Sequence, residues 1–152
     1  MSIEAHLQEL GITLQEPRGP QANYVSAVTT GNLVFLSGTG PYHPDGGLTT
    51  GKVGGERTLE EGYAAARLTM LALLANLRAE IGSLDRVNRI VKLLGMVNCT
   101  PDFNRQPEVI NGASDLLVEI FGERGRHARS AVGMAALPRD ISVEIEMIVE
   151  IQ

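Results

Sequence analysis

The sequence of 152 residues contains no tryptophan, and aromatic residues make up only 4% of it. Aliphatic residues and methionine must therefore build the hydrophobic core, and this length suits one domain with a single core. Cys99 is the single cysteine, which excludes an internal disulfide and a cysteine-rich zinc site. No His-Glu-x-x-His, Walker or Rossmann pattern occurs. We therefore expect neither a metal nor a cofactor.

Positive charge is also scarce, because the formal net charge is −5 and the pI is near 5.2. Nucleic-acid-binding proteins usually carry clustered Lys and Arg, so no nucleic-acid partner is expected. No apolar run approaches the roughly 20 residues that are needed to span a bilayer, and the N-terminus has no signal-peptide pattern. The sequence predicts a soluble, cytoplasmic protein without membrane contact.

Two long stretches show apolar residues at helical spacing. Thr58 and Glu61 form a capping-box pattern at the start of the first, which predicts a helix over 59–81. The second stretch, 107–121, has proline in its first turn, where a helix tolerates it. A shorter helix is expected over 2–10.

Five stretches rich in β-branched and other apolar residues are expected to be strands. They are 24–29, 33–37, 87–97, 128–134 and 142–151. The first two should form a hairpin around a Gly-Asn turn, and the last two should be a pair joined by the Leu-Pro turn between them. The order predicts an α+β domain, in which two long helices cover one face of a mixed sheet.

The last predicted strand alternates between apolar and polar residues. One side is expected to meet the helices and consists of Val143, Ile145, Met147, Val149 and Ile151. The other side carries Glu144 and Glu146. That side could face water in a monomer or neighbouring subunits in a closed oligomer, and alternation alone leaves both possibilities open.

A basic cluster stands out in this acidic chain. Arg124, Arg126, His127 and Arg129 fall within six positions. The planar guanidinium of arginine can grip a carboxylate at two points, so a small anionic metabolite is the simplest ligand. Arginines in a loop are more often solvated, and this is the favoured interpretation of Arg124 and Arg126.

Arg129 differs from its neighbours because it lies inside a predicted strand. It shares a face with Ala131 and Gly133, and two small neighbours leave room for a ligand beside the guanidinium. A structural salt bridge to Glu144 or Glu146 is an equally open interpretation.

Residues 128–138 read Ala-Arg-Ser-Ala-Val-Gly-Met-Ala-Ala-Leu-Pro, and Val-Glu-Ile-Glu follows at 143–146. This pattern resembles the signature of the Rid family (YjgF, reactive intermediate deaminase, also labelled endoribonuclease L-PSP). Leu-Ser-Gly at 36–38, followed by Pro41, resembles the Ser-Gly-Gln-x-Pro turn of the same family. The chain thus resembles a single Rid-like domain over 1–152, with residues 1–20 as an N-terminal extension.

The resemblance implies a chorismate-mutase-like fold and a homotrimer with sites in clefts between subunits. In that frame Arg129 binds the substrate carboxylate, and Glu144 positions the hydrolytic water or assists proton transfer. A second interpretation of Glu144 stays open, in which it acts only as the ion-pair partner that orients Arg129. Further substrate-binding positions implied by the resemblance are Tyr24, Ser37, Gly38, Asn111 and Ala131.

Several positions depart from the family pattern. Ala131 stands where many deaminases have cysteine, Thr39 replaces glutamine, and His127 replaces proline or alanine. The loop over 49–57 is also longer than in the family. These departures indicate a divergent branch, whose substrate can differ from the usual 2-aminoacrylate.

The function that the resemblance implies is cofactor-independent hydrolytic deamination of small enamines or imines, such as 2-aminoacrylate, to 2-oxo acids and ammonia. An alternative is a non-catalytic trimer that binds a small carboxylic acid, which the changes at Ala131 and Thr39 favour. The least favoured alternative is endoribonuclease or translation-inhibitor activity, because the charge of −5 and the scarce aromatic residues do not suit RNA binding.

Overall fold

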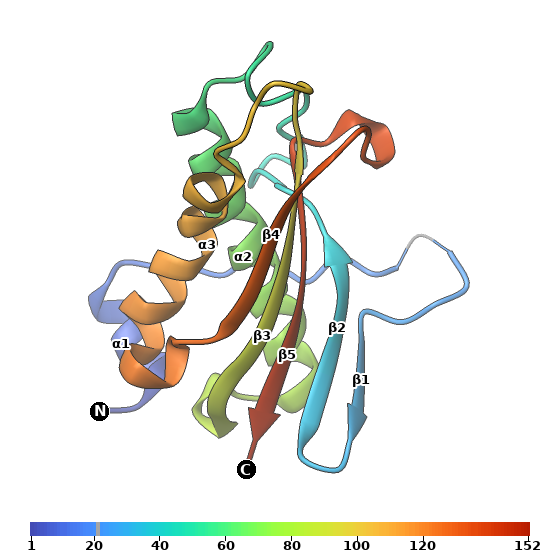
Figure 1. Cartoon of the computed structure of the whole chain (residues 1–152). Coiled ribbons are helices and arrows are strands. Elements are labelled where there is room, and N and C mark those ends of the chain that lie inside the picture. The colour runs from blue at the N-terminus through green and yellow to red at the C-terminus, as the bar shows by residue number, and fades with distance from the viewer. Residues whose placement is uncertain (21) are drawn as a thin grey trace.

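A five-stranded sheet with helices packed on one face forms the molecule, as the computed structural model of residues 1–20 and 22–152 shows (Figure 1). The helices are α1 (Ile3–Glu9), α2 (Leu59–Ile81) and α3 (Gln106–Phe121). The strands are β1 (Ala27–Thr30), β2 (Leu33–Thr39), β3 (Val87–Asn98), β4 (Ala128–Met134) and β5 (Val143–Ile151). Short 3₁₀ turns follow α2, α3 and β4 at 84–86, 122–125 and 138–140. The predicted mixed sheet with two long helices on one face is confirmed.

The strand order in the sheet is β1-β2-β5-β3-β4. Only β3 and β4 pair in parallel, and the other neighbours are antiparallel. The expectation that β4 and β5 form a pair is therefore wrong. Helix α3 connects β3 to β4 and returns the chain to the same end of the sheet, so β4 lies parallel to β3 on its outer side while β5 pairs with the other edge of β3.

The two long helices begin and end where the sequence predicts. The Thr58 hydroxyl accepts a hydrogen bond from the Glu61 backbone N–H, and the Glu61 carboxylate accepts one from the Thr58 N–H, which completes the capping box. Gly82 ends α2 with a φ of 87°, a value that glycine adopts without steric cost. Within α3, a Cβ on Gly112 would overlap the Tyr63 carbonyl oxygen of α2, so the two helices approach closely only because this position has no side chain.

The core lies between the helices and one face of the sheet. The predicted inward side of β5 is buried, with exposed fractions from 0% to 7%. Residues of the first segment join the same core, since Ile3, Leu7 and Leu14 are buried in it. The Asp85 carboxylate accepts hydrogen bonds from the backbone N–H groups of Ile3 and Glu4. Helix α1 is thereby fixed beside the end of α2 and next to α3 (Figure 1).

The opposite face of the sheet carries no helix (Figure 1). Strand register places Phe35 beside Ile148 and Val28 beside Phe35 on this face, and Glu144 lies on it as well. Phe35 is 41% exposed and Val28 is 53% exposed. We call this the open sheet face. In the described part of the chain, no helix has the length and apolar character that crossing a membrane requires.

Candidate functional site

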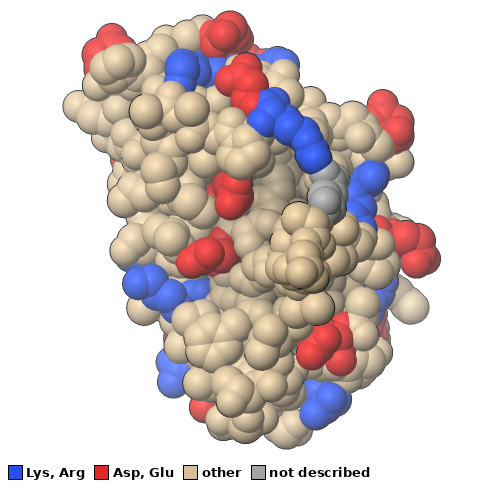
Figure 2. Space-filling view, turned by 90° about the vertical axis from the view of Figure 1, so that its right-hand side faces the viewer, with Lys and Arg blue, Asp and Glu red and all other residues tan. Residues whose placement is uncertain are grey.

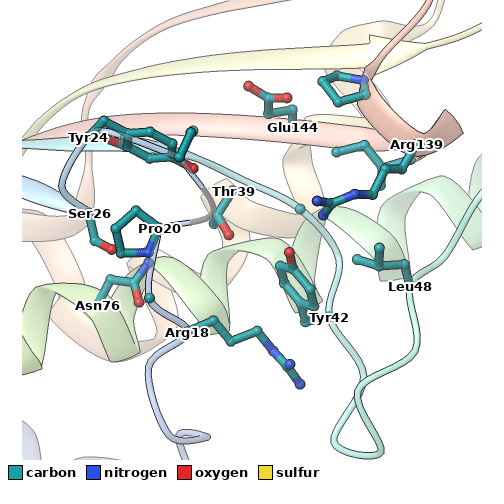
Figure 3. Close-up of a pocket in the computed structure, with 17 residues that line it drawn as sticks. Arg18, Pro20, Tyr24, Ser26, Thr39, Tyr42, Leu48, Asn76, Arg139 and Glu144 are labelled. Atoms are coloured by element: carbon teal, nitrogen blue, oxygen red, sulfur yellow. The ribbon is translucent and has the colours of Figure 1, made fainter.

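A pocket of about 410 Å³ opens at one end of β2 and β5. Its walls come from residues 18–20 and 22–26, the end of β2, the loop over 40–48 and the turn over 138–141 (Figure 3). Four of the residues that the family resemblance singles out line it: Tyr24, Ser37, Gly38 and Glu144. In the side view of the surface, acidic and basic side chains border a central hollow (Figure 2).

Glu144 is held against the floor of this pocket by the backbone of β2. A Cβ on Gly38 would overlap Glu144 Oε2, so the glycine leaves the space that the carboxylate occupies. Partial burial is the main cause that raises the pKa of Glu144 above its usual value, and the charge of Glu146 adds to the effect. A carboxyl group with a raised pKa can exchange a proton near neutral pH more readily than an ordinary glutamate can.

Ser37 and Tyr24 shape the mouth of the pocket. The Ser37 hydroxyl donates to the Val25 carbonyl at 2.7 Å, and the Ser37 N–H donates to the Ser26 carbonyl at 2.9 Å. These two bonds tie the chain before β1 to β2 and place Tyr24, which is 49% exposed, over the opening. Because the Ser37 proton is already engaged, this residue has a structural role at the mouth.

Arg129 lies on the other side of the sheet, toward α3. Its Nη1 donates to Asn111 Oδ1 at 2.8 Å and to Ser114 Oγ at 3.1 Å. Ala131 follows two positions later in β4, on the same side of the strand and against the core. Arg129, Asn111 and Ala131 therefore form a second group of predicted residues, separate from the pocket.

The alternative of a structural salt bridge between Arg129 and Glu144 or Glu146 is wrong for residues within one chain. Arg129 pairs in register with Leu93, a core residue, whereas Glu144 and Glu146 lie on the open sheet face. The sheet itself separates the two sets of charges. Arg126 pairs weakly with Glu123 at 3.7 Å in the exposed turn after α3.

His127 supports Arg129 through Ser114. Its Nδ1 lies 2.6 Å from the Gly125 carbonyl oxygen, which can only accept, so Nδ1 carries the proton. Nε2 lies 2.9 Å from Ser114 Oγ and accepts its proton, and the same oxygen accepts from Arg129. Burial lowers the pKa of His127, and the Arg129 charge adds to the effect. Both effects favour the neutral imidazole.

The structure also brings residues into the pocket that the sequence analysis did not identify as binding residues. Arg18, Tyr42, Asn76 and Arg139 line it, and the Arg18 guanidinium lies 4.5 Å from the centroid of the Tyr42 ring. Arg18 belongs to the segment treated as an extension, and Arg139 follows the Leu-Pro turn. No known pattern in the sequence marks either residue. Among the described residues, no group of three His, Cys, Asp or Glu side chains is arranged to bind a metal.

This fold and pocket match a family model described as "YjgF/chorismate_mutase-like, putative endoribonuclease" over residues 4–150. The chain therefore belongs to this family, which is the Rid family that its sequence resembles. The match begins at residue 4, in agreement with the packing of α1 into the core.

Individual relatives agree with the family assignment. Protein TCP17 of Trypanosoma cruzi is 47% identical over 150 residues, which cover 98% of this chain and 94% of that protein. The structure of Atu1372 from Agrobacterium tumefaciens aligns with a TM-score of 0.91 at 44% identity, over 99% of this chain and 92% of that one. The structure of E. coli TdcF with bound serine aligns with a TM-score of 0.67 at 26% identity, over 92% and 96%. The TM-score for TdcF is lower than that for Atu1372, in agreement with the expectation that this chain belongs to a divergent branch of the family.

Proposed function

We propose that the protein hydrolyses small imines, formed from enamines such as 2-aminoacrylate, to 2-oxo acids and ammonia without a cofactor. The observation that carries this proposal is the fixed guanidinium of Arg129. Both of its hydrogen bonds use Nη1, and within residues 1–20 and 22–152 neither Nε nor Nη2 makes a hydrogen bond or an ion pair. Nε and Nη2 lie along one edge of the planar guanidinium, and a carboxylate can bind this edge at two points.

The reacting site requires two copies of the chain. Arg129 and Glu144 project from opposite sides of one sheet, so one small molecule cannot contact both within a single chain. A homotrimer solves this geometry if the open sheet face of one copy packs against the next. The exposed apolar side chains of Phe35, Val28 and Val132 support such packing, because burying them removes apolar surface from water.

In the proposed reaction, Arg129 of one copy holds the substrate carboxylate and Glu144 of the next copy orients a water molecule. The water oxygen attacks the imine carbon, and its protons pass by way of the Glu144 carboxyl group to the nitrogen. Collapse of the tetrahedral intermediate breaks the C–N bond and releases ammonia, so the imine and water become a 2-oxo acid and ammonia. Holding the reactants in place can lower the barrier by several kcal/mol.

Serine in the TdcF structure supports the binding half of this proposal, because serine carries the same type of carboxylate as the proposed substrates. That relative is a structure with a bound small amino acid, and 26% of its aligned residues are identical to this chain. A pocket that accepts a small amino acid also suits the imine derived from one.

The direct test couples the purified protein to an enzyme that generates 2-aminoacrylate and follows the formation of pyruvate. We expect the wild-type protein to accelerate pyruvate formation, and Arg129→Ala to lose about 10²-fold or more of the activity. Arg126→Ala is the matched control, since Arg126 lies in the same basic cluster but pairs only with Glu123 in the exposed turn. Equal activity of Arg129→Ala and wild type would refute the assigned role of Arg129.

A second candidate function is binding of a small carboxylic acid without turnover. Ala131 favours it, because this position is a cysteine in many deaminases of the resembled family. A thermal-shift titration with 2-oxo acids distinguishes the two functions: stabilisation without accelerated hydrolysis indicates a binding protein.

A further inference from the structure

The turn after β4 places Arg139 in an unusual backbone conformation. Arg139 has a φ of 55° and Asp140 a φ of 58°, and these are the two residues other than glycine with positive φ in the described chain. L-amino acids with a Cβ avoid this region, so two in succession persist only where the surroundings hold them. Such strain often marks a residue that the fold must aim in a particular direction.

Several hydrogen bonds hold the strained turn. Asp140 Oδ1 accepts from Asn98 Nδ2 at 2.9 Å, the Asp140 carbonyl accepts from the Gly51 N–H at 2.8 Å, and the Ile141 N–H donates to the Pro138 carbonyl at 3.2 Å. The side chain of Asp140 thus faces the body of the protein. Arg139 instead extends its guanidinium into the pocket, toward Tyr42 and Leu48 (Figure 3).

Within residues 1–20 and 22–152, the two arginines of the pocket have no acidic partner. Among the described residues, neither Arg139 nor Arg18 makes a side-chain hydrogen bond or ion pair that the structure records, although Arg18 lies over the Tyr42 ring at 4.5 Å. A cation–π contact leaves the positive charge of the guanidinium in place. Glu144 is the one acidic residue among the described lining residues. The pocket therefore concentrates positive charge in a chain of net charge −5.

We propose that Arg139 binds a second acidic group of the substrate. The substrate class is then an imine of a dicarboxylic 2-oxo acid, as formed from an amino acid with an acidic side chain. This inference rests on the proposed function: Arg129 of the neighbouring copy holds the first carboxylate, and Arg139 holds the one on the side chain. Water and the imine give the dicarboxylic 2-oxo acid and ammonia, with no oxidant or reductant.

The size and polarity of the pocket fit this class. Its volume of about 410 Å³ falls within the range of small-molecule sites, roughly 300–1,000 Å³. Ser26, Thr39 and Asn76 add polar groups to its walls (Figure 3). A three-carbon enamine has no group for the Arg139 side of the pocket, whereas a second carboxylate pairs with the guanidinium fork there.

The first experiment measures binding without turnover, on the full-length protein. Isothermal titration compares 2-oxoglutarate and oxaloacetate with 2-oxobutyrate and pyruvate, which are the stable products of the two substrate classes. We expect the dicarboxylates to bind at least 10-fold more tightly. Arg139→Gln should remove this preference while leaving the affinity for 2-oxobutyrate within about twofold, and Arg126→Gln should leave the preference intact.

The second experiment measures turnover with imines that an amino-acid oxidase generates from glutamate or alanine, trapped as semicarbazones when they remain unhydrolysed. For Arg139→Gln we expect kcat/KM to fall at least 10-fold for the dicarboxylic imine and to stay unchanged for the alanine-derived one. Wild-type hydrolysis of both imines with no preference, unaltered by Arg139→Gln, would overturn the inference and leave the proposed deamination standing. Preferential dicarboxylate binding that Arg139→Gln abolishes, with no hydrolysis of any imine, would retain the second anion site and reject the deamination.

Discussion

At the scale of single residues, one intervening hydroxyl connects His127 to Arg129. The neutral imidazole accepts the Ser114 proton, which leaves the Ser114 oxygen free to accept from the guanidinium. Protonation of His127 would reverse the first of these bonds and place a second positive charge beside Arg129. Folding therefore disfavours the protonated imidazole, and the lowered pKa has a consequence for stability.

We expect the free energy of unfolding to fall as the pH drops below 6.5 toward the lowered pKa of folded His127. The unfolded chain binds the proton at the ordinary pKa of 6.5 and the folded chain only at lower pH, so stability is retained above 6.5 and lost over that window. One linked proton corresponds to at most about 1.4 kcal/mol per pH unit. Urea unfolding of wild type and His127→Asn at several pH values measures the difference, and identical slopes would contradict the buried, neutral imidazole.

The residues of the candidate site were predictable where a motif fixes them and not elsewhere. Arg129 and Glu144 follow from the Ala-Arg-Ser and Glu-Ile-Glu patterns, and Tyr24, Ser37 and Gly38 follow from family positions. Arg139 could not be found in this way, because its importance depends on a left-handed backbone that arginine adopts only under tertiary constraint. Arg18 was not predictable in this way either, because residues 18–20 reach the pocket only through the tertiary fold.

At the scale of helices, α2 and α3 are held together by close packing rather than by surface charge. A side chain at Gly112 would displace the backbone of α2 at Tyr63. The pair Arg67–Glu119 also joins these helices, at 3.3 Å, but both side chains are about two-fifths exposed. Exposed ion pairs of this kind contribute little to stability.

Gly112→Ala should therefore lower the free energy of unfolding by about 2–4 kcal/mol, because the added methyl group meets backbone that cannot rotate away. Glu119→Ala, which removes the surface pair between the same helices, should cost less than about 1 kcal/mol. Chemical denaturation of both variants checks the comparison. A larger loss for Glu119→Ala than for Gly112→Ala would show that charge dominates this contact.

Helices and strands were predictable from local patterns, but their neighbours in the sheet were not. The capping box, the helical spacing and the alternation of β5 placed each element within a few residues. The order of β5, β3 and β4 depends on which edge of β3 the chain reaches after α3. The sequences of the three strands do not contain that information. Alternation also could not decide what covers the open sheet face.

At the scale of the whole molecule, the open sheet face predicts an oligomer. Phe35 lies beside Ile148 in the register and is 41% exposed, and a charge there would oppose the burial of neighbouring apolar side chains. We expect light scattering to give a mass three times the 16.3 kDa of the chain, and Phe35→Glu to give a smaller mass and to lose hydrolysis while retaining its circular dichroism spectrum.

The matched control is Ala79→Glu, an exposed position on α2, the helix that packs on the sheet face opposite to the open one (Figure 1). This variant should change neither the mass nor the rate. A wild-type monomer that hydrolyses imines at full rate would contradict a site shared between copies.

Because the sheet lies between Arg129 and Glu144, two defective proteins should be able to repair each other. A trimer assembled from Arg129→Ala and Glu144→Gln chains contains some clefts in which an intact guanidinium of one chain faces an intact carboxyl group of another. If the chains mix at random in equal amounts, about one cleft in four is whole, as expected for a closed ring of identical interfaces. Unfolding and refolding the two inactive variants together would then recover up to about a quarter of the wild-type rate, although neither variant carries a complete site of its own.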